Sequence, residues 1–254
     1  MPPLLAEPFF YAASVPAVIL VGLSKGGLGG AVAIIGLPLM ALAMPPVQAA
    51  AIMLPILIVM DWASLWTWRG YYDLATLKIM LPGALLGIFA GYMLAAHITE
   101  DMIRLAVGII ALLFVLRYYF PGKLGRDAAR PQQPMLGIFW GAVAGLTSFM
   151  AHAGGPPYQV YAMPLRHHPR VFTGTSVIFF AIVNAIKVLP YFALGQFDAT
   201  NLEASAVLLP LAPLSTFAGA FLVKRMKPEV FYPLMYAMVG LVALKLVWDG
   251  AMGV

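Results

Sequence analysis

The chain has 254 residues, of which 62% are hydrophobic and only 10% are Asp, Glu, Lys or Arg. Soluble domains carry about 25% charged residues, so a water-facing surface cannot be assembled from this composition. The mean hydropathy of +0.91 agrees and predicts that lipid covers most of the outer surface. The net charge of +5 lies mainly in short gaps between apolar runs, which is typical of membrane topology signals and not of nucleic-acid binding.

Eight apolar regions follow one another along the chain, and six have the length of an ordinary membrane helix. In chain order they are a broken region at 9–44, helices at 48–68, 75–96 and 102–118, a second broken region at 135–165, and helices at 171–193, 202–223 and 229–247. The breaks are the segments SKGGLGG at 24–30 and HAGGPP at 152–157.

The two broken regions are too long for one straight crossing. A helix over residues 9–44 would be about 54 Å long, against a hydrocarbon core of about 30 Å, so the chain must bend back. Arms of roughly 15 residues are compatible with a re-entrant hairpin or with two short tilted spans, and the sequence does not separate these options. Both options leave the two ends of each region on the same side.

The distribution of positive charge gives the orientation. If both broken regions return to their own side and the loop at 117–134 is cytoplasmic, eleven loop Lys and Arg residues lie inside and only Arg104 and Lys245 lie outside. If each region instead crosses the membrane once, seven of these Lys and Arg residues lie inside and six lie outside. The first arrangement is favoured, and it predicts that both termini lie outside.

Short segments recur in order in the two halves, which indicates an internal duplication. Residues 22–23 recur as 145–146 at an offset of 123, and residues 89–91 recur as 217–219 at an offset of 128. Each half contains one hairpin and three spans, so an odd number of crossings inverts the second half. We predict an all-α polytopic membrane protein built as an inverted repeat. Its units are the first repeat at 1–118, a cytoplasmic linker at 119–134 and the second repeat at 135–254.

Two lysines, Lys25 and Lys187, remain inside the apolar regions after the loop residues are set aside. An ammonium at the bilayer centre costs at least about 2.5 kcal/mol on insertion scales, so it needs a partner or a water-filled cavity. Lys25 lies at the first break, where exposed N–H groups and a helix N-terminus would favour an anion. The residues predicted to contact the anion there are Ser24, Lys25, Gly26, Gly27, Gly29 and Gly30.

An inverted repeat would place the second break opposite the first, near the midplane, so that one anion lies between two helix starts. Pro156 and Pro157 suit the first turn of a helix at this point. The predicted contacts are Ser148, His152, Gly154, Gly155, Tyr158 and Gln159. For His152, the sequence leaves a ligand contact, a proton site and a packing role open.

Three further polar residues in the spans are candidates for coupling or gating. Asp61 could pair with Lys25, carry protons or form a purely structural salt bridge. Asn184 occupies the equivalent place in the second half, which favours a shared pore-facing position. Lys187 could instead extend to the outer interface, as long charged side chains often do.

Motifs in both halves resemble a known family. The first half contains GLSKGGLGGAVAIIGLPLMALAM followed by a span and RGYYD, and the second contains GLTSFMAHAGGPPYQVYAMPL followed by RVFTGTSVIFF and LGQFD. From about residue 14 to 248 the chain resembles the TauE/SafE family of sulfite exporter-like membrane proteins. The resemblance implies transport of sulfite or a small organosulfur anion such as sulfoacetate.

We therefore expect a multi-pass secondary transporter of the bacterial inner membrane that alternates access around a midplane site, with no enzymatic activity, cofactor or nucleic-acid partner. Its expected partners are the anion and the lipid bilayer, and the sequence leaves a homo-oligomer open. An anion channel shares every charge feature and remains an alternative. A less favoured alternative is an intramembrane metalloenzyme using His152, His167 and His168, because no HExxH motif or carboxylate cluster accompanies them.

Overall fold

The computed structural model describes residues 3–28, 32–94, 99–120, 129–193 and 199–253. These residues form helices and turns without any strand. The first half contains α1 (Pro3–Ala6), α2 (Pro8–Gly27), the 3₁₀ helix η1 (Val32–Ile35), α3 (Gly36–Ala41), α4 (Pro46–Trp68), α5 (Leu74–Leu94) and α6 (Glu100–Tyr119). The second half contains α7 (Pro134–Ala151), α8 (Gly155–Ala162), η2 (Met163–Leu165), α9 (Pro169–Ala193), α10 (Ala199–Leu208), α11 (Leu211–Lys224) and α12 (Pro228–Met252).

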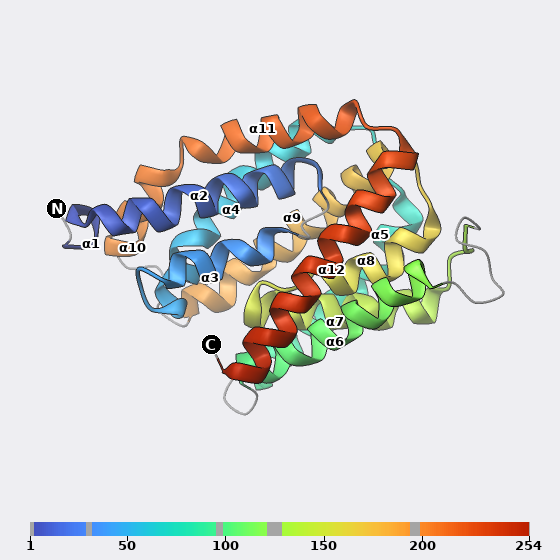
Figure 1. The fold of residues 1–254 in the computed structure, drawn as a ribbon, viewed down its shortest axis with the longest axis horizontal. Coiled ribbons are helices and arrows are strands. Elements are labelled where there is room, and N and C mark those ends of the chain that lie inside the picture. Colours follow the sequence, from blue (N-terminus) through green and yellow to red (C-terminus); the bar gives the residue numbers. More distant parts are fainter. Residues whose placement is uncertain (1–2, 29–31, 95–98, 121–128, 194–198, 254) are drawn as a thin grey trace.

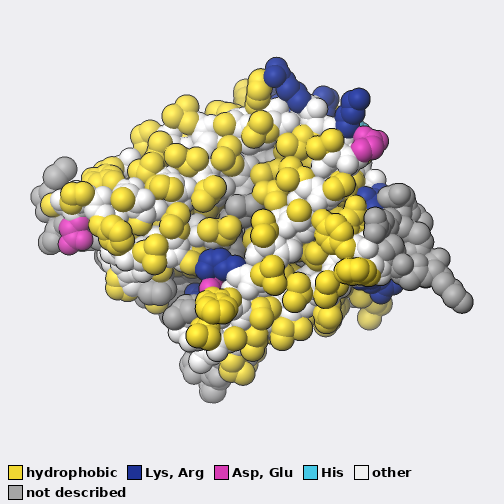
Figure 2. Space-filling view, in the orientation of Figure 1, with side chains coloured by type: hydrophobic (Ala, Val, Ile, Leu, Met, Phe, Trp, Pro, Cys, Tyr) yellow, Lys and Arg dark blue, Asp and Glu magenta, His cyan; other side chains and the backbone are white. Residues whose placement is uncertain are grey.

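The helices have the length and composition of membrane spans. Within the described ranges, seven are long and apolar enough to cross a bilayer, or eight if the bent pair α10 and α11 forms one span. Figure 2 shows one face of the molecule covered mainly by hydrophobic side chains, with a group of Lys and Arg side chains near one end. The chain is an all-α polytopic membrane protein, as its sequence predicts.

Each broken region has one long arm and one short returning arm. At 1.5 Å per residue the 20 residues of α2 extend about 30 Å, whereas η1 and α3 together are half as long. In Figure 1 the chain leaves α3 at the end of the molecule where the N-terminus lies, and the C-terminus lies toward that same end. The regions therefore return to their own side, but their arms are unequal and not the roughly equal arms expected from the sequence.

The span predicted at 202–223 is not an ordinary straight helix. It is divided into α10 and α11, which meet at an angle of 45°. Pro210 lies at this break and Pro213 lies in the first turn of α11. Each proline lacks an N–H donor and its ring clashes with the carbonyl four residues earlier, which explains the bend.

Glycines let helices of the two halves approach closely. α2 packs along α11, and α5 packs along α7, while α6 and α12 form a third pair (Figure 1). A Cβ on Gly26 would lie 2.0 Å from the Thr216 carbonyl oxygen, and one on Gly87 would lie 1.9 Å from the Ala142 carbonyl oxygen. α2 and α11 join the hairpin of the first half to the second half. α5 and α7 join the hairpin of the second half to the first half. Such an exchange is what an inverted duplication would produce, and the duplication itself remains a prediction.

Candidate functional site

The end of α2 is held by side chains from two neighbouring helices. A helix C-terminus leaves four carbonyl groups without intrahelical partners. Here each of the last four carbonyls of α2 accepts a hydrogen bond. The donors are Leu28 N to Ser24 O (2.8 Å), Ser64 Oγ to Lys25 O (3.3 Å), Trp68 Nε1 to Gly26 O (2.6 Å) and Thr173 Oγ1 to Gly27 O (3.0 Å). These bonds to α4 and α9 fix the position of Lys25 in the last turn.

Lys25 forms a buried ion pair with Asp61 of α4. Lys25 is 9% exposed and Asp61 is 4% exposed, and the Lys25 Nζ donates to Asp61 Oδ1. The other carboxylate oxygen, Oδ2, accepts a hydrogen bond of 2.6 Å from Asn184 Nδ2 of α9. Lys25 Nζ also lies 5.8 Å from the centroid of the Phe180 ring. The carboxylate therefore neutralises Lys25 and is held by both halves of the chain.

Lys187 of α9 is buried without such a neutralising partner. It is 1% exposed, so it does not extend to the outer interface. Its Nζ donates to Ser148 O (3.1 Å) and Ser148 Oγ (3.2 Å), which are uncharged acceptors. Within the described part of the chain, no carboxylate lies within ion-pair distance of Lys187. An ammonium has three donors, so one N–H of Lys187 remains for another acceptor.

The two lysines line one cavity of about 40 Å³ between the breaks. This space can hold ordered water or a small ion. Its polar wall consists of Lys25, Ser148, His152, Gly155, Asn184 and Lys187. The rest of the wall is apolar and comes from α2, η1, α3, α4 and Phe180. With both lysines protonated and the carboxylate bound to Lys25 ionised, the cavity carries a net charge of one positive.

The chain matches the sulfite exporter TauE/SafE family over residues 14–246, which is nearly its whole length. It belongs to this family. No curated protein and no solved structure matches the chain. The match identifies it as a member of a family of membrane transporters for sulfite and related sulfur compounds.

The first break of this TauE/SafE protein does not present all of its predicted residues to the cavity. Gly26 and Gly27 lie in the last turn of α2, where their N–H groups belong to the helix, and their Cα atoms face α11. Close packing against α11 therefore accounts for glycine at these two positions, and neither residue lines the cavity. Ser24 Oγ accepts a hydrogen bond of 3.2 Å from Ala33 N and thus bridges the break. Gly29 and Gly30 lie outside the described residues.

At the second break, the residues divide between cavity and packing. His152 takes a left-handed conformation with φ of 51°, which turns the chain from α7 toward α8 and leaves the side chain on the cavity wall. Gly155 also lines the cavity. A Cβ on Gly154 would lie 2.8 Å from the Ala144 carbonyl oxygen, so Gly154 allows close packing.

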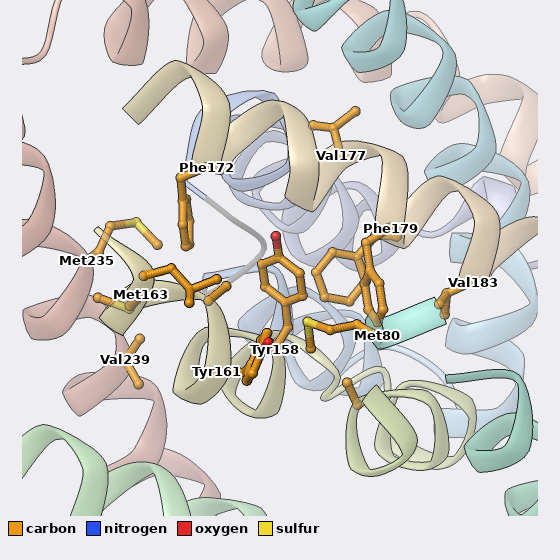
Figure 3. Close-up of a cluster of buried hydrophobic side chains, with 14 of the residues drawn as sticks. Met80, Tyr158, Tyr161, Met163, Phe172, Val177, Phe179, Val183, Met235 and Val239 are labelled. Carbon is orange, nitrogen blue, oxygen red and sulfur yellow. The ribbon is translucent and has the colours of Figure 1, made fainter. Parts of the chain in front are cut away.

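Tyr158 and Gln159 are fully buried in α8 but do not line the cavity. Figure 3 shows the Tyr158 ring within a cluster of apolar side chains from several helices, among them Phe179 and Met80. Its ring centroid lies 5.0 Å from that of Phe179. Tyr158 therefore lies in the core and not on the cavity wall, where the sequence places it, because its ring packs against the rings of Phe172, Phe179 and Phe180 of α9.

A second polar cluster lies at the end of the molecule nearest the linker. Asp73 Oδ2 accepts hydrogen bonds from Thr76 N (2.8 Å), Thr76 Oγ1 (2.6 Å) and Gln132 Nε2 (2.6 Å), and His167 Nε2 lies 3.6 Å away. Partial burial raises the pKa of Asp73, but these hydrogen bonds and the nearby His167 outweigh burial and leave the pKa below its usual value. Asp73 thereby caps α5 and connects it to residues before α7 and α9.

The histidines do not assemble as the metalloenzyme alternative requires. His152 lies on the cavity wall, whereas His167 lies beside Asp73. In the ranges that the structure describes, no three His, Asp or Glu side chains are placed to hold a metal ion.

The sequence did not single out Ser64, Thr173 and Phe180, although all three contact the site. Ser64 and Thr173 bind carbonyls at the end of α2, and Phe180 lies on the cavity wall beside Lys25. A usable signal exists for Ser64, because it precedes Lys187 by 123 positions, the offset that relates the two breaks. Phe180 has no comparable signal among the many apolar residues of its span.

Proposed function

We propose that this TauE/SafE protein is an inner-membrane secondary transporter of a small sulfur-containing anion, such as sulfite or the organosulfonate sulfoacetate. The observation that carries the proposal is the pair of buried lysines at one cavity, of which Lys25 pairs with a carboxylate and Lys187 does not. A buried charge without a partner is costly in an apolar interior. An anion in the cavity would supply the missing negative charge.

The cavity wall offers suitable contacts for a small oxyanion. Lys187 has one N–H left after binding Ser148, and the Ser148 hydroxyl and His152 ring lie on the same wall. Gly155 begins α8 and lines the cavity, and its N–H is the donor that the first turn can offer, because Pro156 and Pro157 lack an N–H and Tyr158 N donates to Gly154 O at 3.2 Å. Because the volume is small and the remaining wall apolar, the site suits a compact anion with few polar groups.

The position of the site between the halves supports alternating access. Lys25 comes from α2 of the first half, and Lys187 comes from α9 of the second. Asp61 is bonded to a residue of each half, so movement of one half against the other would change the partners of the anion. Inverted-repeat carriers bind substrate at such midplane positions between discontinuous helices.

The charge distribution supports an orientation with the termini outside. The end of the molecule nearest the linker carries basic residues in loops and at helix ends, namely Arg69, Arg166, Arg170, Lys224, Arg225 and Lys227. Arg170 Nη2 donates to Lys224 O at 3.3 Å, so the start of α9 and the end of α11 lie side by side. By the positive-inside rule this end faces the cytoplasm.

The test is transport of labelled sulfite by the purified protein in liposomes. We expect saturable flux with counterflow in the wild type, and loss of at least about tenfold in Lys187→Met, since a charged contact is worth about 1.5–3 kcal/mol. Lys25→Met should lose flux as well, but it also leaves the Asp61 carboxylate without its lysine partner. Lys187→Met is therefore the variant that is easier to interpret. Lys78→Met is the matched control, because Lys78 is exposed on α5 and lies outside the cavity. Wild-type flux in Lys187→Met would refute the proposal, and unsaturated conductance would indicate a channel.

A further inference from the structure

Asp61 occupies the position in which a substrate anion would pair with Lys25. Its Oδ1 accepts from Lys25 Nζ, and its Oδ2 accepts from Asn184 Nδ2 at 2.6 Å. Both donors also lie on the cavity wall. An anion that entered the cavity would therefore meet two donors already used by a carboxylate of the protein. Binding requires either that the anion share them or that Asp61 give them up.

For a doubly charged anion, the net charge of the site decides whether the anion shares the two donors with Asp61 or replaces Asp61. With Asp61 ionised, a dianion would leave the buried site with one net negative charge. With Asp61 protonated, the two lysines match the dianion and the site is neutral. An uncompensated charge in a water-poor site is strongly disfavoured, so the neutral combination is the more stable one.

The surroundings of Asp61 can hold both protonation states. The Asn184 amide contains a donor and an acceptor, so it can donate to the ionised carboxylate and, after turning, accept from the protonated one. The charged or titratable groups around the cavity from the elements packed near Asp61 are Lys25 of α2, Lys187 of α9 and His152 after α7. None of these is a second carboxylate, and His152 shares the wall with two lysines, whose positive charges disfavour a further cation there, so Asp61 is the better site for the proton.

We propose that the cavity takes a doubly charged anion together with one proton, and that Asp61 carries this proton. When the dianion enters, Asp61 takes a proton from water on the same side and releases Lys25 to the anion. When the dianion leaves on the other side, Asp61 loses the proton there and pairs with Lys25 again. The anion and the proton thus move in the same direction, and one net negative charge crosses per cycle. An interior-negative membrane potential favours the outward direction of this cycle.

The inference rests on the proposed transport function, and infrared difference spectroscopy of the lipid-embedded protein tests it separately. Addition of sulfite at a pH where its doubly charged form predominates should produce the C=O stretching band of a protonated carboxyl group. The band should shift with carbon-13-labelled aspartate, disappear in Asp61→Asn and persist in Asp249→Asn, whose carboxylate lies outside the cavity.

A second variant keeps the test decisive if Asp61→Asn fails to fold. Asn184→Leu leaves the carboxylate in place but removes its hydrogen-bond partner, so the band should change frequency. A wild type that is stabilised by sulfite but shows no new carboxyl band would overturn the inference and leave the transport function standing. A band unaffected by Asn184→Leu would also overturn the assignment to Asp61. Sulfite that neither stabilises nor crosses would refute the proposed function, and this inference with it.

Discussion

Asn184 donates to Asp61 at 2.6 Å, and the two residues are 123 positions apart, the offset that relates the two breaks in the sequence. The same offset relates two other contacts at the site. Ser64 Oγ donates to Lys25 O, and Lys187 Nζ donates to Ser148 O, with 39 positions between the partners in each case. Lys25 and Ser148 are thus equivalent positions at the two breaks, and Ser64 and Lys187 are equivalent positions in the spans that follow. The first half has its lysine at the break, and the second half has its lysine in the span.

Packing of α2 against α11 should depend on glycine at position 26. In Gly26→Ala the new Cβ would lie 2.0 Å from the Thr216 carbonyl oxygen, which is backbone and cannot move alone. Overpacking of this kind costs about 1–3 kcal/mol, and it displaces the helix that carries Lys25. We expect a lower thermal unfolding temperature in detergent and reduced sulfite flux.

Gly240→Ala is the matched control for this prediction. A Cβ at Gly240 meets only Val115 Cγ1 at 3.3 Å, and alanine has the better helix propensity. Its unfolding temperature should stay close to that of the wild type. Equal stability of the two variants would mean that α2 and α11 are not in close contact in the membrane.

The Asp73 carboxylate should make stability depend on pH in the acid range. Its pKa is below the ordinary value of 3.8 in the folded protein, so the ionised form stabilises the fold above that value. This contribution is lost as pH falls through the folded pKa. Asp73→Asn should therefore unfold more easily than the wild type at pH 7, and the difference should shrink as the pH is lowered below about 4. A difference that grows on acidification would contradict the assigned hydrogen bonds.

Labelling of introduced cysteines should report the orientation, because the chain has no natural cysteine. Met252→Cys lies at the exposed end of α12, and Lys227→Cys lies between α11 and α12 at the opposite end of that helix. In intact cells an impermeant maleimide should label position 252 and not position 227. Labelling of position 227 alone would indicate the opposite topology, with the termini inside, and would contradict the prediction from the positive charges.

The residues that meet at the cavity were predictable because charge is expensive in a membrane. Lys25, Asp61, Asn184 and Lys187 stand out in apolar spans, and the structure brings all four together. The family was recognised from the motifs around the two breaks, and its match covers residues 14–246.

Packing was much less predictable from the sequence. In a soluble helix the apolar face marks the core, but here the surfaces that face lipid and protein are both apolar. Pro210 and Pro213 mark the division of α10 from α11 in the sequence. The inward turn of Tyr158 and the tight packing at Gly26, in contrast, have no clear periodic signal. Tertiary contacts between the halves decide these features, and single-chain patterns do not contain them.

The position of a bound anion tests the account most directly. Selenite has the shape and charge of sulfite and a strong anomalous signal, so crystals of the protein grown with selenite should show one selenium peak in the cavity. We predict that this peak lies within hydrogen-bond reach of Lys187 Nζ and Lys25 Nζ, between α2 and α9. A selenium site elsewhere on the protein, with the cavity empty and Lys25 still paired to Asp61, would contradict the account.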